Sequence, residues 1–132
     1  MRALLLRVGD DSYAVPIEVA REVLAATSIT ALPTAPSSVI GLCNVRGEII
    51  PVFDTGVLLG LGPIPSTAAV AILETAVGPA GLATSDMGEA VELGDLVGHS
   101  EGAGTAGAFA VEGGLAVLLD VEMLLAPARV AS

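Results

Sequence analysis

Short apolar runs of β-prone residues, separated by turn residues, dominate the pattern along this chain. Such a pattern predicts the strands of an all-β barrel or sandwich. Four pairs of runs flank a short glycine-containing turn, which is typical of β-hairpins. We predict hairpins over Ala3–Val8 and Ser12–Val15, Gly41–Val45 and Glu48–Phe53, Val70–Thr75 and Gly81–Thr84, and Gly107–Val111 and Leu115–Leu119.

Single strands predicted over Ser28–Leu32 and Glu89–Leu93 bring the count to about ten, in two sets of five. That division predicts a protein with two lobes. The segment Gly62–Ser66 contains two prolines and is interpreted as the crossover between them. We expect the first lobe to span approximately residues 12–66 and the second approximately 67–120, with the strand 3–8 and a C-terminal helix over 121–127 free to cross between the lobes.

Two segments have a helical pattern instead. Pro16–Ala26, between the second and third strands, carries apolar residues at helical spacing and a proline near its first turn. The apolar face of this predicted helix would hold Ile17, Ala20, Val23 and Leu24, and its outer face Glu18, Arg21 and Glu22. A second short helix is predicted over Val121–Leu125, capped by Asp120 and stopped by Pro127.

Composition narrows the classes of partner. The chain carries 15 acidic residues against five arginines and no lysine, for a net charge of −10. Nucleic acid is therefore not an expected partner. Nine of the carboxylates lie between Glu74 and Glu122, which suits either a basic partner surface or a solvated surface kept soluble by charge.

The mean hydropathy of +0.81 and two uncharged stretches, Val23–Val45 and Thr55–Leu73, raise the question of a membrane protein. Two prolines with several serines and threonines in the first stretch, and two prolines with three glycines in the second, do not suit a continuous spanning helix. The apolar run at the N-terminus is too short for a signal peptide. We therefore expect a cytoplasmic protein without direct membrane insertion. The single cysteine, Cys43, lies in an apolar run and is interpreted as a buried, inert thiol in a reducing compartment.

Little in the sequence points to a cofactor or a metal. Gly98–Gly107 is rich in glycine and is predicted to be a mobile loop. It lacks a Gly-Lys-Ser/Thr motif and does not lead from a strand into a helix, so it does not predict a phosphate site. A barrel that binds a small molecule would line its cavity with aromatic side chains, but the chain has only Tyr13, Phe53 and Phe109. We expect no cofactor.

The most informative stretch is Gly41–Asp54, with the sequence GLCNVRGEIIPVFD. Alternating residues on both sides of Arg46-Gly47 favour a hairpin, with the glycine supplying the positive φ of the turn. Pro51 cannot donate a hydrogen bond to a neighbouring strand, so the returning strand is predicted to lie at an edge or to be bulged there.

The spacing of these residues closely resembles the signature of the chemotaxis coupling-protein (CheW-like) family, in which Asn-Leu-Arg-Gly leads into an apolar strand ending in Pro-Val-x-Asp. The resemblance extends upstream to Tyr13–Ile17 and Ala20–Val23, and downstream to Gly81–Asp86 and Gly113–Leu125. It implies two SH3-like five-stranded β-barrels packed together, with a short helix between strands 2 and 3 and a C-terminal helix. This agrees with the strand count.

The resemblance also implies a function. Proteins of this family are non-enzymatic adaptors that couple the cytoplasmic tip of a methyl-accepting chemoreceptor to the regulatory domain of a CheA-type histidine kinase, and they are recruited to membrane-receptor signalling arrays. The receptor tip is held in a groove between the two barrels. The positions that match receptor-binding or neighbouring positions of the family are Ala20, Glu22, Gly41, Asn44, Arg46 and Gly47.

Among these positions, Glu22 and Arg46 match a polar pair of the family. An arginine on a turn that faces a nearby glutamate can make a charge-assisted contact that locks one element to another. Two interpretations remain open: the pair touches the receptor, or it only holds the fold and shapes the groove.

An enzyme hypothesis starts at the end of the same stretch. Asp54-Thr55-Gly56, after an apolar strand, resembles the catalytic tripeptide of retroviral-type aspartic proteases, in which two paired aspartates share a proton. Capping of a helix or formation of a turn by Asp54 accounts for the same residues.

Overall fold

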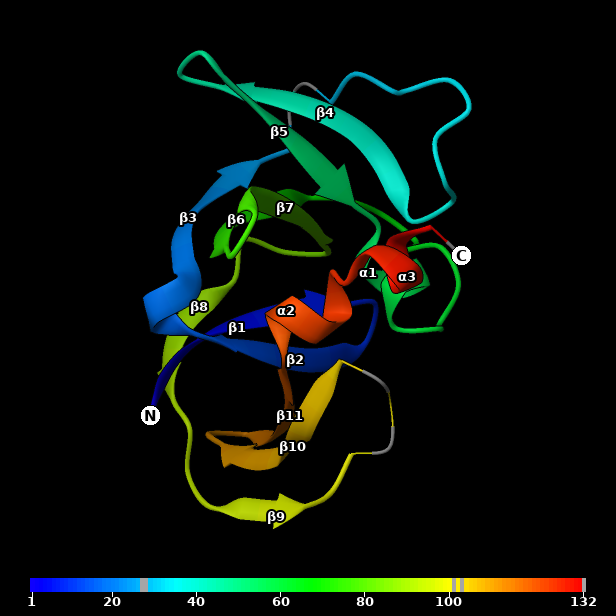
Figure 1. The fold of residues 1–132 in the computed structure, drawn as a ribbon. Coiled ribbons are helices and arrows are strands. Elements are labelled where there is room, and N and C mark those ends of the chain that lie inside the picture. Colours follow the sequence, from blue (N-terminus) through cyan, green and yellow to red (C-terminus); the bar gives the residue numbers. More distant parts are fainter. Residues whose placement is uncertain (27–28, 101, 103, 132) are drawn as a thin grey trace.

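The computed structural model of the protein describes residues 1–26, 29–100, 102 and 104–131. Strands dominate this part of the chain, and the helices are single turns (Figure 1). The strands are β1 (Arg2–Val8), β2 (Asp11–Pro16), β3 (Ala20–Ala25), β4 (Val39–Val45), β5 (Glu48–Phe53), β6 (Ala69–Thr75), β7 (Gly78–Thr84), β8 (Glu89–Glu92), β9 (Leu96–Gly98), β10 (Thr105–Val111) and β11 (Gly114–Leu119). The helices are the 3-10 turn η1 (Ile17–Val19), α1 (Thr55–Leu58), α2 (Val121–Leu124) and α3 (Pro127–Val130).

The middle of the chain forms one sheet, in the order β3-β6-β7-β5-β4, which we call the central barrel. Its outermost strands are joined through the segment that follows β3. The backbone N–H of Ala26 still donates to Ala68, at 3.1 Å, and Thr30 then exchanges two backbone hydrogen bonds with Leu42 on β4. One continuous segment therefore reaches from β6 to β4, and the five-stranded sheet curls closed.

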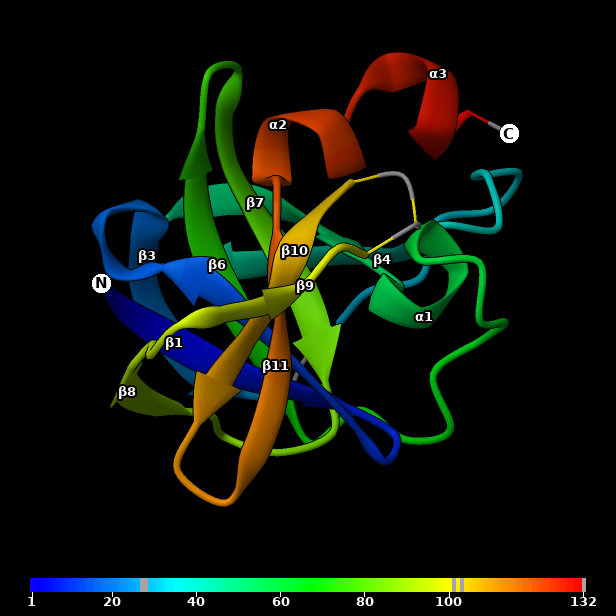
Figure 2. The ribbon, with the colours of Figure 1, turned by 90° about the horizontal axis from the view of Figure 1, so that it is seen from below.

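The two ends of the chain form the second sheet, in the order β8-β1-β2-β11-β10-β9, which we call the terminal barrel. Strand β2 from the first hairpin pairs in parallel with β11 from the last one. The edge strands β8 and β9 follow each other along the chain, and Figure 2 shows β9 lying beside β10. Between them, Leu93 donates to Met1 and Gly94 donates to Ala110, so β8 and β9 act as one bent strand that closes the barrel.

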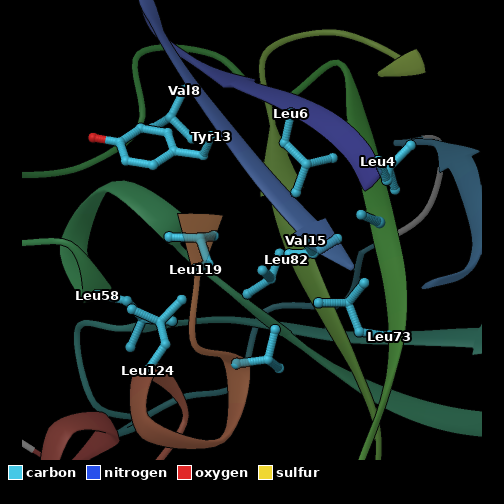
Figure 3. Close-up of a cluster of buried hydrophobic side chains, with 12 residues drawn as sticks. Leu4, Leu6, Val8, Tyr13, Val15, Leu58, Leu73, Leu82, Leu119 and Leu124 are labelled. Carbon is cyan, nitrogen blue, oxygen red and sulfur yellow. The ribbon is translucent and has the colours of Figure 1, made fainter. Parts of the chain in front are cut away.

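The two barrels share a core of buried side chains. Figure 3 shows leucine, valine and tyrosine side chains from both sheets converging on one space. Leu6 and Val15 come from the terminal barrel, Leu73 and Leu82 from the central barrel, and Leu124 from α2, and all five are essentially inaccessible to solvent. Because burial of a large aliphatic side chain contributes about 1.5–3 kcal/mol, this shared cluster joins the barrels into one folding unit.

The fold predicted from the sequence is confirmed in its main lines. All four predicted hairpins form, as does the strand at Glu89, and each barrel contains five strands when β8 and β9 are counted together. Strands β7 and β11 begin earlier than predicted, at Gly78 and Gly114, so two-residue turns connect β6 to β7 and β10 to β11. Strand β10 also begins earlier, at Thr105. The predicted cap of the last helix is also present, because Asp120 Oδ1 accepts a hydrogen bond of 3.1 Å from the N–H of Met123.

Two predictions for the segment after β2 were wrong. The helix predicted over Pro16–Ala26 is only the turn η1, and Ala20–Ala25 is strand β3. The register of β3 against β6 shifts between Ala20 and Glu22, and this bulge disturbs the period of two that would have identified a strand. The strand predicted over Ser28–Leu32 reduces to the bridge at Thr30, and Ser28 lies outside the described residues.

The C-terminal third also differs from the prediction. The segment predicted as a loop over Gly98–Gly107 is shortened at both ends by β9 and β10, and residues 101 and 103 lie outside the described part. The helix predicted over Val121–Leu125 does end before Pro127, as α2, with Leu125 as its C-cap. Pro127 then begins a separate turn that was not predicted, α3, where a proline at the first helical position is well tolerated.

The sheets also do not divide at residues 66–67. Strands β6 and β7 belong with β3, β4 and β5, and the terminal barrel combines the first strands of the chain with the last ones. The predicted division followed sequence order, whereas the parallel pairing of β2 with β11 brings the two ends of the chain together.

Candidate functional site at the β4–β5 hairpin

The β4–β5 hairpin ends in a tight turn that carries the predicted motif. Val45 pairs directly with Glu48, which leaves Arg46 and Gly47 as a two-residue loop with φ values of +51° and +87°. Positive φ at both central positions is the geometry that fits the twist of a hairpin. The side chain of Asn44 completes the turn, because its Oδ1 accepts a hydrogen bond of 2.8 Å from the N–H of Gly47.

Strand β3 faces this turn with two adjacent charges. Ala20 pairs with Leu73 of β6 and Glu22 pairs with Ile72, so Arg21 is an extra residue in β3 and forms a bulge. In a regular strand neighbouring side chains point to opposite faces, but a bulge re-aims one of them. Arg21 and Glu22 both contact the β4–β5 hairpin for this reason.

Glu22 and Arg46 form a charge-assisted ion pair between the strand and the turn. Glu22 Oε2 accepts from Arg46 Nη2, with the side chain of Arg46 70% exposed and that of Glu22 only 23% exposed. The hydrogen bond from Arg46 lowers the pKa of Glu22 below the ordinary glutamate value, and the same bond raises the pKa of Arg46. The pair is therefore fully charged at neutral pH, with an arginine that remains open to solvent.

Arg21 makes the other link between β3 and its surroundings. Its Nη1 donates to Glu48 Oε1 at 2.9 Å, and its Nε lies 3.0 Å from Glu74 Oε1 on β6. The hydrogen bond to Glu48 raises the pKa of Arg21 further above its already high value. The helical spacing predicted an outward position for Arg21 and gave no role to Glu48 or Glu74, because only the bulge brings these three side chains together.

An apolar pocket opens beside the turn. It has a volume of about 240 Å³ and is lined by Leu24, Ala25, Ala26, Ile29, Cys43, Asn44, Val45 and Val70. All of these residues belong to the central barrel or to the segment that closes it, so this pocket is not a groove between the two barrels. Cys43 is half-buried, and burial raises the pKa of its thiol, which keeps the sulfur protonated at neutral pH.

The six predicted site residues lie at three places in the structure: four at the β4–β5 turn, and Ala20 and Gly41 each elsewhere. Glu22 and Arg46 contact each other, and Asn44 and Gly47 close the same turn. Ala20 begins β3 and packs against the core shared by the barrels.

Gly41 lies away from the turn, at the closure of the central barrel. A Cβ atom added there would lie 2.1 Å from the carbonyl oxygen of Thr30. Gly41 is therefore required by the close approach of two backbone segments.

The residues behind the protease hypothesis have structural roles. Asp54 is the N-cap of α1, where Oδ1 accepts hydrogen bonds of 3.1 Å from the N–H groups of both Val57 and Ile64. The hydroxyl of Thr55 donates to the carbonyl of Ala83 at 2.6 Å, and a Cβ on Gly56 would lie 2.3 Å from the carbonyl oxygen of Gly62. Capping and close backbone packing thus account for the tripeptide, and the structure gives no support to an aspartic protease.

Two further properties concern metal binding and membranes. Within the described ranges, no three histidine, cysteine, aspartate or glutamate side chains gather as metal ligands. None of the helices in the described part of the chain has the length and hydropathy needed to span a membrane.

A two-barrel β protein with a charged pair at a projecting hairpin is the class that this fold and site define. Comparison with known protein families identifies the family within this class. A profile of the CheW-like domain matches residues 2–129, and the chain belongs to this family.

Individual proteins agree with this assignment. The chain is 35% identical over 65 residues to a probable chemotaxis protein CheW of Rhizobium etli, a match that covers 49% of this chain and 42% of that protein. It is 48% identical over 48 residues to protein FrzA of Myxococcus xanthus, covering 36% of this chain and 30% of FrzA. Both matches therefore span less than half of the relative's own length.

The same fold occurs in a solved structure. The crystal structure of the scaffolding protein TtCheW from Thermoanaerobacter tengcongensis superposes with a TM-score of 0.77 at 23% identity, covering 93% of this chain and 86% of that one. The two SH3-like barrels expected from the sequence are confirmed as the architecture of this chain.

Proposed function

We propose that this chain is a non-enzymatic adaptor that couples the cytoplasmic domain of a methyl-accepting chemoreceptor to the regulatory domain of a CheA-type histidine kinase. Membership of the CheW-like family and the similarity to chemotaxis proteins support this function. Such an adaptor works in the cytoplasm and is recruited to receptor signalling arrays at the membrane.

The observation that carries the receptor assignment is the geometry of Arg46. Its backbone adopts a left-handed conformation, which glycine, asparagine and aspartate occupy more readily than arginine. A residue held in such a conformation at an exposed turn suggests selection for what its side chain does. The guanidinium is anchored on one side by Glu22 and is otherwise largely exposed, so it can donate hydrogen bonds to acceptors on a receptor tip.

Charge reversal at this position tests the proposal. Arg46→Glu places a carboxylate beside Glu22, and we expect binding to a receptor cytoplasmic fragment to weaken at least roughly tenfold. Isothermal titration calorimetry with the purified fragment measures this. Arg7→Glu, the same reversal at an exposed position of β1, is the matched control and should leave the affinity unchanged.

Two results would contradict the receptor assignment: wild-type protein that does not bind the fragment, or Arg46→Glu that binds as well as the control. Binding of the kinase regulatory domain is measured separately with the same three proteins. Because Arg46 is assigned to the receptor, Arg46→Glu should retain the kinase affinity of the control.

A further inference from the structure

The β4–β5 hairpin lacks backbone support from β7 at the end that carries Arg46. Strand β5 pairs with β7 only at Val52 and Phe53. From Glu48 to Pro51 the β7 side of β5 has no ladder partner, and Pro51 has no N–H to offer one. The sequence predicted that Pro51 lies on an edge strand or at a bulge. Strand β5 is an interior strand of the sheet, and Pro51 lies where it has diverged from β7. The turn of the hairpin extends away from the rest of the central barrel (Figure 1). Its position therefore depends on the pairing of β5 with β4 and on side-chain contacts.

Arg21 bridges this open end. Its guanidinium contacts Glu48, the first residue of β5, and Glu74 on β6. Strand β7 separates β5 from β6 in the sheet order, so the guanidinium links two strands that are not neighbours. Glu48 stands directly opposite Val45 and immediately follows the turn, so a contact at Glu48 acts within two residues of Arg46.

The charges on the two elements are complementary in order. Strand β3 presents a cation and then an anion, Arg21 and Glu22, and the hairpin presents Glu48 to the first and Arg46 to the second. Exchanging these partners would place Glu48 against Glu22 and Arg46 against Arg21, which are like charges in both cases. Unfavourable like-charge contacts of this kind select one arrangement over its neighbours.

We propose that Arg21 is a positioning residue that acts through Glu48 and Glu74 to hold the β4–β5 hairpin where Arg46 meets Glu22. The inference deepens the proposed receptor function and rests on it, because Arg46 is the group being positioned. The side chains of Arg21, Glu48 and Glu74 are 33%, 44% and 51% exposed. Exposed ion pairs contribute little to folding, so the clamp acts on the position of the tip and not on global stability.

A double-mutant cycle tests the clamp. Arg21→Gln, Glu48→Gln and the double variant are compared with the wild type by ¹⁵N relaxation of the Arg46 Nε–H group in the free protein, which is tractable because the chain has only five arginines. We expect the order of the Arg46 side chain to fall in each single variant. The double variant should be no more mobile than either one, because the two residues act as a unit.

Affinity for the receptor fragment should weaken in parallel, by roughly two- to fivefold in each of the three variants, while the melting temperature stays near that of the wild type. Glu112→Gln, an exposed change of the same kind in the β10–β11 turn, is the control and should alter neither quantity.

The outcomes separate the two proposals. The positioning role would be overturned if the order of the Arg46 side chain were unchanged in Arg21→Gln. It would also be overturned if the losses of order in the two single variants added in the double variant. Both results are independent of receptor binding. A wild-type protein that does not bind the receptor fragment would overturn the proposed function, and the relaxation data from the free protein would still decide whether the clamp exists.

Discussion

Glu22 and Arg46, separated by 24 positions in the chain, form an ion pair that ties the bulge of β3 to the tip of the β4–β5 hairpin. The glutamate is largely covered and the arginine largely exposed, so the covered member anchors the exposed one. The two interpretations left open by the sequence, fold support and partner contact, are therefore compatible in one pair.

The charge state of Glu22 makes this contact dependent on pH. Its pKa is lower in the folded protein than in the unfolded chain, because Arg46 donates a hydrogen bond to the carboxylate. The unfolded state consequently takes up the proton first as the pH falls. Stabilisation by the pair is complete above the ordinary glutamate pKa of about 4.3 and is lost as the pH falls through the lower folded value.

We expect the difference in melting temperature between the wild type and Glu22→Gln to be constant from pH 7 to about pH 5, and to shrink below about pH 4.3. Thermal unfolding followed by circular dichroism across this range measures it. A difference in melting temperature that grows toward low pH would show that folding does not lower the pKa of Glu22.

The sequence predicted those elements whose signal is local. A hairpin is specified by two adjacent runs and the turn between them, and all four predicted hairpins form. Pairing between distant segments leaves no such signal. The parallel contact of β2 with β11 decides which strands share a barrel, and it joins the two ends of the chain.

The geometry of the candidate site was predicted in part for the same reason. The turn residues Asn44, Arg46 and Gly47 belong to one continuous motif and were recognised from it. Arg21 and Glu48 were missed as partners, because one extra residue in β3 mixes the period of a strand with the spacing of a helix. Only the observed register shows that Arg21 and Glu22 reach the same hairpin.

Gly41 offers a test of how the central barrel closes. A methyl group at this position would overlap the backbone of Thr30, which cannot withdraw without breaking its two hydrogen bonds to Leu42. We expect Gly41→Ala to destabilise the protein by at least about 2 kcal/mol. Urea denaturation measures the loss. Gly114→Ala is the control, because a Cβ there meets nothing within 4 Å, and a similar loss in both variants would count against the close approach.

Asp54 separates the capping role from the protease hypothesis. Its carboxylate accepts hydrogen bonds from the N–H groups of Val57 and Ile64, which an alanine cannot replace. We expect Asp54→Ala to lower the free energy of unfolding by about 0.5–2 kcal/mol. Asparagine caps helices nearly as well as aspartate, so Asp54→Asn should lose less. Pepstatin-sensitive peptide cleavage at acid pH by the wild type, abolished in Asp54→Asn, would revive the enzyme hypothesis.

The core shared by the barrels predicts that they unfold together, and a substitution confined to one barrel tests this. Ile50 is fully buried in a cluster that belongs to the central barrel alone, and Ile50→Ala should lower the free energy of unfolding by about 2–5 kcal/mol. Tyr13 is the only tyrosine and the chain has no tryptophan, so near-ultraviolet circular dichroism and fluorescence of Tyr13 report on the terminal barrel. Tyr13 packs in the shared cluster with Leu73 and Leu82. The unfolding midpoint reported by Tyr13 in Ile50→Ala should therefore shift by as much as the midpoint of the far-ultraviolet circular dichroism signal. A Tyr13 midpoint that stays at the wild-type value would mean that the terminal barrel folds independently.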